Sequence, residues 1–304
     1  MICLTSLADP VNYPVIQGDT MSGSGFIADS IQTWKLTLSY DGTDYHGWQV
    51  QPGQRTVQGE LRVALGRITG ETPLPQGSGR TDAGVHALGQ VASFTLQARI
   101  PAENLVRALN RTLPPSIRIL EARTMPTGFH ARHSALAKTY EYRVWVENQE
   151  CAEICSPFLA RYVYVCPWRL DCDALNAAAR LLLGDHDFAS FAASDPDLAT
   201  RTQDADDAME IDFPATTRTV FTSTWAESAT DFGPLLIYRI RGNGFLHHMV
   251  RNLVGTMIEV GRGAIEAGDI PAVFAARSRS AAGPTAPARG LFLHSVEYGQ
   301  GQDL

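Results

Sequence analysis

Residues 77–90 read Gly-Ser-Gly-Arg-Thr-Asp-Ala-Gly-Val-His-Ala-Leu-Gly-Gln, and the rest of the chain is interpreted outward from this stretch. Its glycines let the backbone take positive φ angles or approach a ligand closely. Arg80 and Asp82 are two residues apart, and such residues point to the same side of an extended segment. The loop therefore offers a guanidinium and a carboxylate together, and the strand-like run over 90–96 would hold it still.

The chemistry of this loop allows three interpretations. It can be a tight turn with a surface ion pair, the ordinary meaning of a loop built from Gly, Asp and Arg. It can be a phosphate-binding loop, although the Walker spacing and its Lys-Ser/Thr pair are missing. It can also present a catalytic carboxylate, Asp82, that is held by an arginine. Residue chemistry alone leaves the three interpretations open.

The composition excludes several classes of protein. The chain has 304 residues, of which 44% are hydrophobic and 19% charged, as in ordinary globular proteins. This length allows one large core or two domains of about 100–150 residues each. No apolar run approaches the ~18–20 residues that span a membrane, and the N-terminus lacks the pattern of a signal peptide. We therefore expect a cytoplasmic protein.

The cysteines and histidines do not predict a metal site. The cysteine count is odd and no CxxC pair occurs, which argues against a disulfide framework and against zinc; the residues are Cys3, Cys151, Cys155, Cys166 and Cys172. Two neighbouring histidines, His247 and His248, fall in a predicted helix. Because adjacent helical residues diverge by about 100°, we expect that this pair does not chelate an ion together.

Charge is distributed unevenly along the chain. The net charge is −7, which is unusual for a protein that binds nucleic acid. Between Asp185 and Asp231, however, eleven acidic residues stand against two arginines, so the rest of the chain carries about +2. Between Arg99 and Arg143 there are eight basic and three acidic residues. Because the local field attracts a polyanion, this basic stretch is compatible with binding RNA.

Residue periodicity predicts the same order of elements twice. The first half reads strand, helix, strand, strand, helix, strand, over residues 34–40, 57–69, a short strand near Leu74, 90–96, 101–111 and 117–122. The second half repeats this order over residues 139–146, 171–183, 220–226, 235–241, 245–260 and 291–298. Each half therefore has the split-βαβ pattern, and a substrate can bind in a cleft between two such sheets.

The run Gly79-Arg80-Thr81-Asp82-Ala83-Gly84-Val85-His86 closely resembles the signature of the tRNA pseudouridine synthase A family. Further stretches that resemble the family follow in order, and together they cover about Trp34 to Tyr298: residues 45–49, 129–132, 137–142, 245–252 and 290–293. The resemblance implies an α+β pseudouridine synthase fold. Two split-βαβ (ferredoxin-like) halves would form a continuous mixed sheet flanked by helices, with a cleft between the halves.

The two halves divide the chain into segments. We expect a flexible N-terminal extension over residues 1–33, a first α/β half over 34–130, and a second half over 131–299. The first half carries the glycine-rich loop that contains Asp82, called the aspartate loop below. An acidic loop insertion is expected over 194–217, and a short tail over 300–304. The aromatic stretch Tyr45-His46-Gly47-Trp48-Gln49 can stack on RNA bases, but core packing is the more common role of such residues.

The resemblance also implies the roles of particular residues. Asp82 would be the catalytic carboxylate, and Arg251, in Phe245-Leu-His-His-Met-Val-Arg-Asn252, would be its ion-pair partner. Tyr140 would stack on the flipped uracil or transfer a proton, although a strand tyrosine can equally be a core residue. Arg80 would contact phosphate or fill the gap left by the flipped base, and Leu291 would line the uracil pocket.

The function that this resemblance implies is the isomerisation of uridine to pseudouridine at positions 38, 39 and 40 of the tRNA anticodon stem-loop, with Asp82 as nucleophile. No cofactor and no metal are expected, because the reaction has no redox step, and the family implies a homodimer bound to tRNA. Two other hypotheses are a non-catalytic RNA-binding protein of the same fold and a metal-dependent hydrolase that uses Asp82.

Overall fold

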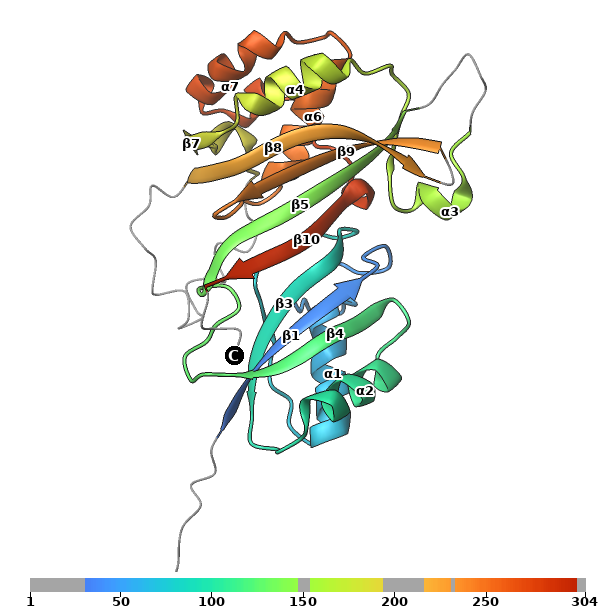
Figure 1. Cartoon of the computed structure of the whole chain (residues 1–304), viewed down its shortest axis with the longest axis vertical. Helices are drawn as coiled ribbons and strands as arrows, with labels where there is room; N and C mark the ends of the chain where they lie inside the picture. Colours follow the sequence, from blue (N-terminus) through green and yellow to red (C-terminus); the bar gives the residue numbers. More distant parts are fainter. Residues whose placement is uncertain (1–30, 147–153, 194–215, 231–232, 300–304) are drawn as a thin grey trace, which may run out of the picture. The chain divides into compact units, whose positions relative to one another are not determined.

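The computed structural model describes residues 31–146, 154–193, 216–230 and 233–299 (Figure 1). Nearly all of the expected extension over 1–33, most of the acidic insertion over 194–217 and the tail over 300–304 lie outside the described residues. The described part contains a ten-stranded mixed sheet with helices packed against it, which confirms the predicted α+β class and mixed sheet. No helix in these ranges is long and apolar enough to cross a membrane.

The first half of the sheet is built from four antiparallel strands and two helices. Its elements are β1 (Gln32–Tyr40), α1 (Val57–Thr69), β2 (Gln76–Gly77), β3 (His86–Leu96), α2 (Ala102–Thr112) and β4 (Ile117–Met125). The strands lie in the order β4-β1-β3, and β2 pairs with β3. Thr56 begins α1, because its side chain accepts a hydrogen bond from the amide of Gly59, and Gly70 ends it at φ 77°.

The second half repeats this topology. Its elements are β5 (Ala135–Val146), α3 (Pro157–Ala160), β6 (Tyr164–Cys166), α4 (Cys172–Arg180), β7 (Gly184–Asp187), β8 (Thr217–Thr230), β9 (Gly233–Gly242), α6 (Met249–Gly261), α7 (Ile270–Ala276) and β10 (Leu291–Tyr298). The strands lie in the order β10-β5-β9-β8. In the first half β4 lies beside β1, β1 beside β3, and β3 beside β2. In the second half β10, β5, β9 and β8 take the corresponding positions, with the short strands β6 and β7 added. The duplication predicted from element order therefore extends to sheet topology.

The halves join where β10 runs parallel to β3. Only two residue pairs form this junction, Phe292 with His86 and Leu293 with Ala87, while β10 pairs with β5 along most of its length. Because β3 begins at His86, the aspartate loop of the first half lies at the junction with the second half (Figure 1).

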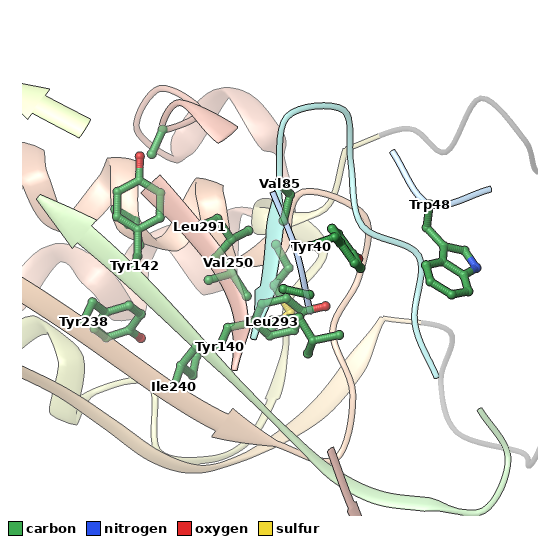
Figure 2. Packing of buried hydrophobic residues seen from close by; sticks show 14 of the residues in the cluster. Tyr40, Trp48, Val85, Tyr140, Tyr142, Tyr238, Ile240, Val250, Leu291 and Leu293 are labelled. Carbon is green, nitrogen blue, oxygen red and sulfur yellow. The ribbon is translucent and has the colours of Figure 1, made fainter. Parts of the chain in front are cut away.

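One hydrophobic cluster runs through both halves. Tyr140, Tyr142 and Val144 of β5 are all buried, as the alternation of that strand predicts. All three belong to the same cluster as Trp48 of the first half and Leu293 of β10. Figure 2 shows Tyr140 and Tyr142 in this cluster. The site loops are therefore supported by a continuous core.

Several predicted boundaries were wrong. The helix predicted over 245–260 begins at Met249, and the helix predicted over 171–183 ends at Arg180. The short strand predicted near Leu74 lies at Gln76–Gly77, whereas β6, β7 and α7 were not predicted. The missed strands are three and four residues long, too short to produce a readable period.

Candidate active site

The segment that contains Tyr45 and Trp48 is hydrogen-bonded to the aspartate loop. The amide of Trp48 donates to the carbonyl of Thr81 at 3.0 Å, and the amide of Gly84 donates to the carbonyl of Tyr45 at 3.2 Å. The side chains of Tyr45 and Trp48 are buried, at 3% and 2% exposure. They therefore pack in the core, as predicted, and are not exposed to stack on bases. The close approach requires Gly77, because a Cβ there would lie 2.6 Å from Trp48 Cε2.

Gln90 of β3 fixes the other end of the loop. Its side chain is fully buried; Nε2 donates to the carbonyl of Gly79 at 2.9 Å, and Oε1 accepts from the hydroxyl of Ser78 at 2.7 Å. The hydroxyl of Tyr40 bonds that of Thr81 at 2.7 Å. The residues on both sides of Arg80 are therefore tied to the sheet through buried polar side chains.

Asp82 meets Arg251 of α6. Nη1 of Arg251 donates to Oδ2 of Asp82 at 2.9 Å, and Nε of the same guanidinium donates to the carbonyl of Ala286 at 2.8 Å. The two side chains are 17% and 15% exposed, so they are largely shielded but still reachable from solvent. The ion pair expected between them is thus present, and it connects the loop of the first half to the helix of the second.

His247 and His248 also face Asp82. Nε2 of His247 lies 3.6 Å from Oδ1 of the carboxylate, and Nε2 of His248 lies 3.3 Å from Oδ2. The expectation that these imidazoles diverge was wrong, because residues 245–248 precede α6. His248 has φ 58°, in the left-handed region, and the rings stand 4.0 Å apart. Burial lowers the pKa of His248, although Asp82 opposes that effect, so we expect its imidazole to be neutral at pH 7.

Tyr140 is buried beside the aspartate loop. Its ring meets that of Phe245 edge to face at 5.1 Å, and its hydroxyl lies 3.9 Å from the position that a Cβ on Gly79 would occupy. Burial, with smaller effects of Tyr40 and Asp82, raises the pKa of Tyr140, so the phenol remains a proton donor at neutral pH. Leu291, at the start of β10, is buried opposite Tyr142, and Leu293 is opposite Tyr140 (Figure 2).

Cationic side chains lie close to the aspartate loop. Arg80 is half-buried in the loop, and Lys138 of β5 places Nζ 3.4 Å from the position of a Cβ on Gly79. Burial lowers the pKa of Lys138 to about 8, and Arg132 and Arg218 act in the same direction. A phosphate placed among these cations would be attracted by all of them.

The structure thus brings Asp82, Arg251 and Tyr140 together, with Arg80 in the same loop and Leu291 in the core beneath. It adds Gln90, Lys138 and the two histidines, which the sequence analysis did not assign to the site. Gln90 is the last residue of the stretch 77–90, and this position beside the aspartate loop could have identified it. The two histidines were missed because the helical pattern of apolar residues continues through positions 247 and 248.

The chain is similar to known proteins along most of its length. The sequence model of the tRNA pseudouridine synthase family matches residues 37–134 and 178–299. Proteins named tRNA pseudouridine synthase A are similar along most of the chain. That of Solibacter usitatus is 49% identical and that of Moorella thermoacetica 44% identical, each over 87% of this chain and 98% of the relative. That of Bacillus pumilus is 43% identical over the same shares. The family model and the relatives both include the aspartate loop, and the chain belongs to the tRNA pseudouridine synthase family.

Proposed function

We propose that this protein converts uridine to pseudouridine at positions 38, 39 and 40 of the tRNA anticodon stem-loop, with Asp82 as the nucleophile. The observation that carries the proposal is the ion pair between Asp82 and Arg251 in a chain of this family. The reaction breaks the N1–C1′ bond, rotates the base and joins it to the ribose through C5. It needs a carboxylate that is held in one orientation and can be reached by the nucleotide.

The contacts of Asp82 supply these conditions. Arg251 fixes one carboxylate oxygen, and its own orientation is fixed by the bond to Ala286. Tyr140 can lie against the flipped uracil, and its neutral phenol can donate a hydrogen bond or a proton. Leu291 would close the apolar side of the base pocket, and Arg80 would contact the RNA backbone or occupy the space left by the base.

RNA binding would rely on the local positive field, since the total charge is negative. Lys138 lies beside the loop, and Arg132 and Arg218 are both close enough to lower its pKa, so the three cations can contact phosphates of one RNA backbone. We further propose that the protein is a homodimer, so that basic surfaces of two subunits share one tRNA. Size-exclusion chromatography with light scattering tests this part, and a monomeric mass at working concentration would contradict it.

The activity test uses unmodified tRNA with uridine at position 38, 39 or 40. Pseudouridine is mapped by carbodiimide treatment and primer extension, for the native protein and for Asp82→Asn. We expect product at these positions with the native protein and a loss of about 10³-fold or more with the variant. Bound tRNA without product from the native protein would favour a non-catalytic RNA-binding protein. Equal product from both proteins would remove Asp82 from the catalytic role.

A further inference from the structure

Three potential metal ligands converge at the aspartate loop. Asp82, His247 and His248 each offer one ligand atom, and these atoms all lie within 4.8 Å of one another. The proposed isomerisation uses the carboxylate and assigns no role to the two imidazoles. The left-handed backbone of His248 directs the neighbouring rings to the same carboxylate, which a continuous helix would not do.

The spacing of these atoms is close to that of a zinc site. Bonds of ~2.0–2.2 Å to nitrogen and oxygen place neighbouring tetrahedral ligands about 3.3–3.5 Å apart. Nε2 of His247 lies 3.6 Å from Oδ1 of Asp82, and Nε2 of His248 lies 3.3 Å from Oδ2. Small side-chain rotations would therefore complete a two-histidine, one-carboxylate set with a fourth position open to water.

We propose that Asp82, His247 and His248 bind a late first-row divalent cation, typified by Zn²⁺, and that this ion inhibits the enzyme reversibly. The inhibitory part rests on the proposed function, because an ion bound to Asp82 would block its attack on the nucleotide. Imidazole ligands favour Zn²⁺, Co²⁺ and Ni²⁺ over Mg²⁺, which prefers oxygen ligands and retains its waters.

Arg251 limits the affinity of this site for a cation. Its guanidinium already bonds Oδ2 of Asp82, which is also the oxygen nearest His248. An ion would therefore take Oδ1, beside His247, and the imidazole of His248 would have to rotate toward it. The nearby positive charge repels a cation and weakens binding relative to a structural zinc site. The ion would accordingly exchange with the solution and compete with RNA for Asp82.

Metal binding is tested without RNA and independently of activity. Co²⁺ is titrated into the full chain while its visible absorption is recorded, and Zn²⁺ is then used to displace it. We expect one Co²⁺ per chain with the spectrum of an ordered nitrogen–oxygen site, and at least tenfold weaker binding in His247→Asn and His248→Asn. Asparagine tolerates the left-handed backbone at position 248, so this variant should fold.

Two control variants exclude other ligands. His133 belongs to another close histidine pair, with His130 at 4.3 Å between ring centroids, and Cys155 carries a half-buried thiol. His133→Asn and Cys155→Ser should bind Co²⁺ as tightly as the native chain. Unchanged Co²⁺ binding in both His247→Asn and His248→Asn would overturn the proposed site, as would its loss in either control.

Inhibition is measured separately, with each variant compared with its own metal-free rate of pseudouridine formation. Zn²⁺ should inhibit the native protein, excess Mg²⁺ should not, and a chelator should restore the rate. His248→Asn should require at least tenfold more Zn²⁺ for the same inhibition. Binding of Co²⁺ without inhibition by Zn²⁺ would overturn the inhibitory role. Absence of product from metal-free native protein would contradict the proposed function, while the Co²⁺ titration would still decide the site.

Discussion

Asp82 and Arg251 stand 169 positions apart in the sequence, yet Nη1 of the arginine lies 2.9 Å from Oδ2 of the aspartate. The aspartate comes from the loop between β2 and β3, and the arginine from the first turn of α6. Their contact makes the site a joint product of both halves of the sheet. Predictions about the site therefore concern the geometry of this pair and of the loop that presents it.

Replacing Arg251 with lysine should lower the rate of pseudouridine formation by about 100-fold, the scale of a misplaced catalytic group. Lysine keeps the charge but cannot bond Asp82 and the carbonyl of Ala286 with two fixed nitrogens, as the guanidinium does. Single-turnover assays with excess enzyme measure the effect. Arg262→Lys, which changes a surface pair with Glu259 near the end of the same helix, is the control and should keep the native rate.

Replacing Gln90 with alanine should lower the free energy of unfolding by about 1–3 kcal/mol, because buried partners lose their hydrogen bonds. Gln90 is fully buried and bonds the hydroxyl of Ser78 and the carbonyl of Gly79. Urea unfolding measures the change. Leu88→Ala, at an exposed position of the same strand, should cost much less, and equal losses in both variants would contradict the role given to Gln90.

Replacing Gly77 with alanine should destabilise the protein by about 1–3 kcal/mol through overpacking. The new Cβ would lie 2.6 Å from Cε2 of the buried Trp48, so the loop or the indole must shift. Gly268→Ala is the matched control, since a Cβ there meets nothing within 4 Å and should change stability by about 0.5 kcal/mol or less. Thermal or urea unfolding of both variants decides, and a native midpoint for Gly77→Ala would contradict the close packing.

The affinity for tRNA should fall as the pH rises through about 8, in part because of Lys138. Burial lowers the pKa of Lys138 to about 8, so the free protein carries this charge below that pH and loses it above. A bound phosphate favours the charged form, and binding is therefore stronger on the acid side. Filter binding from pH 7 to 9 measures the slope. Lys138→Arg keeps its charge throughout and should flatten it, and an identical slope in both proteins would assign the pH dependence to other groups.

Much of the fold could be predicted because its signals are local. The alternation of β5 and the helical period of 57–69 correspond to elements in the structure, and the repeated element order predicted the repeated sheet. The pairing of Asp82 with Arg251 came from the family resemblance, since no local pattern connects residues so far apart. His248 could not be placed, because the helical period continues smoothly through it while the backbone turns to φ 58°.

The position of β10 has a consequence for how the protein is made. This strand pairs with β3 of the first half and β5 of the second, and it follows all other described strands in the chain. A nascent chain on the ribosome can assemble β1 to β4 early, but β3 then lacks the partner that covers its edge. Asp82 would be translated long before Arg251 and β10 emerge. The enzyme should therefore acquire activity only late in synthesis, and ribosome-bound chains halted before β10 should be inactive.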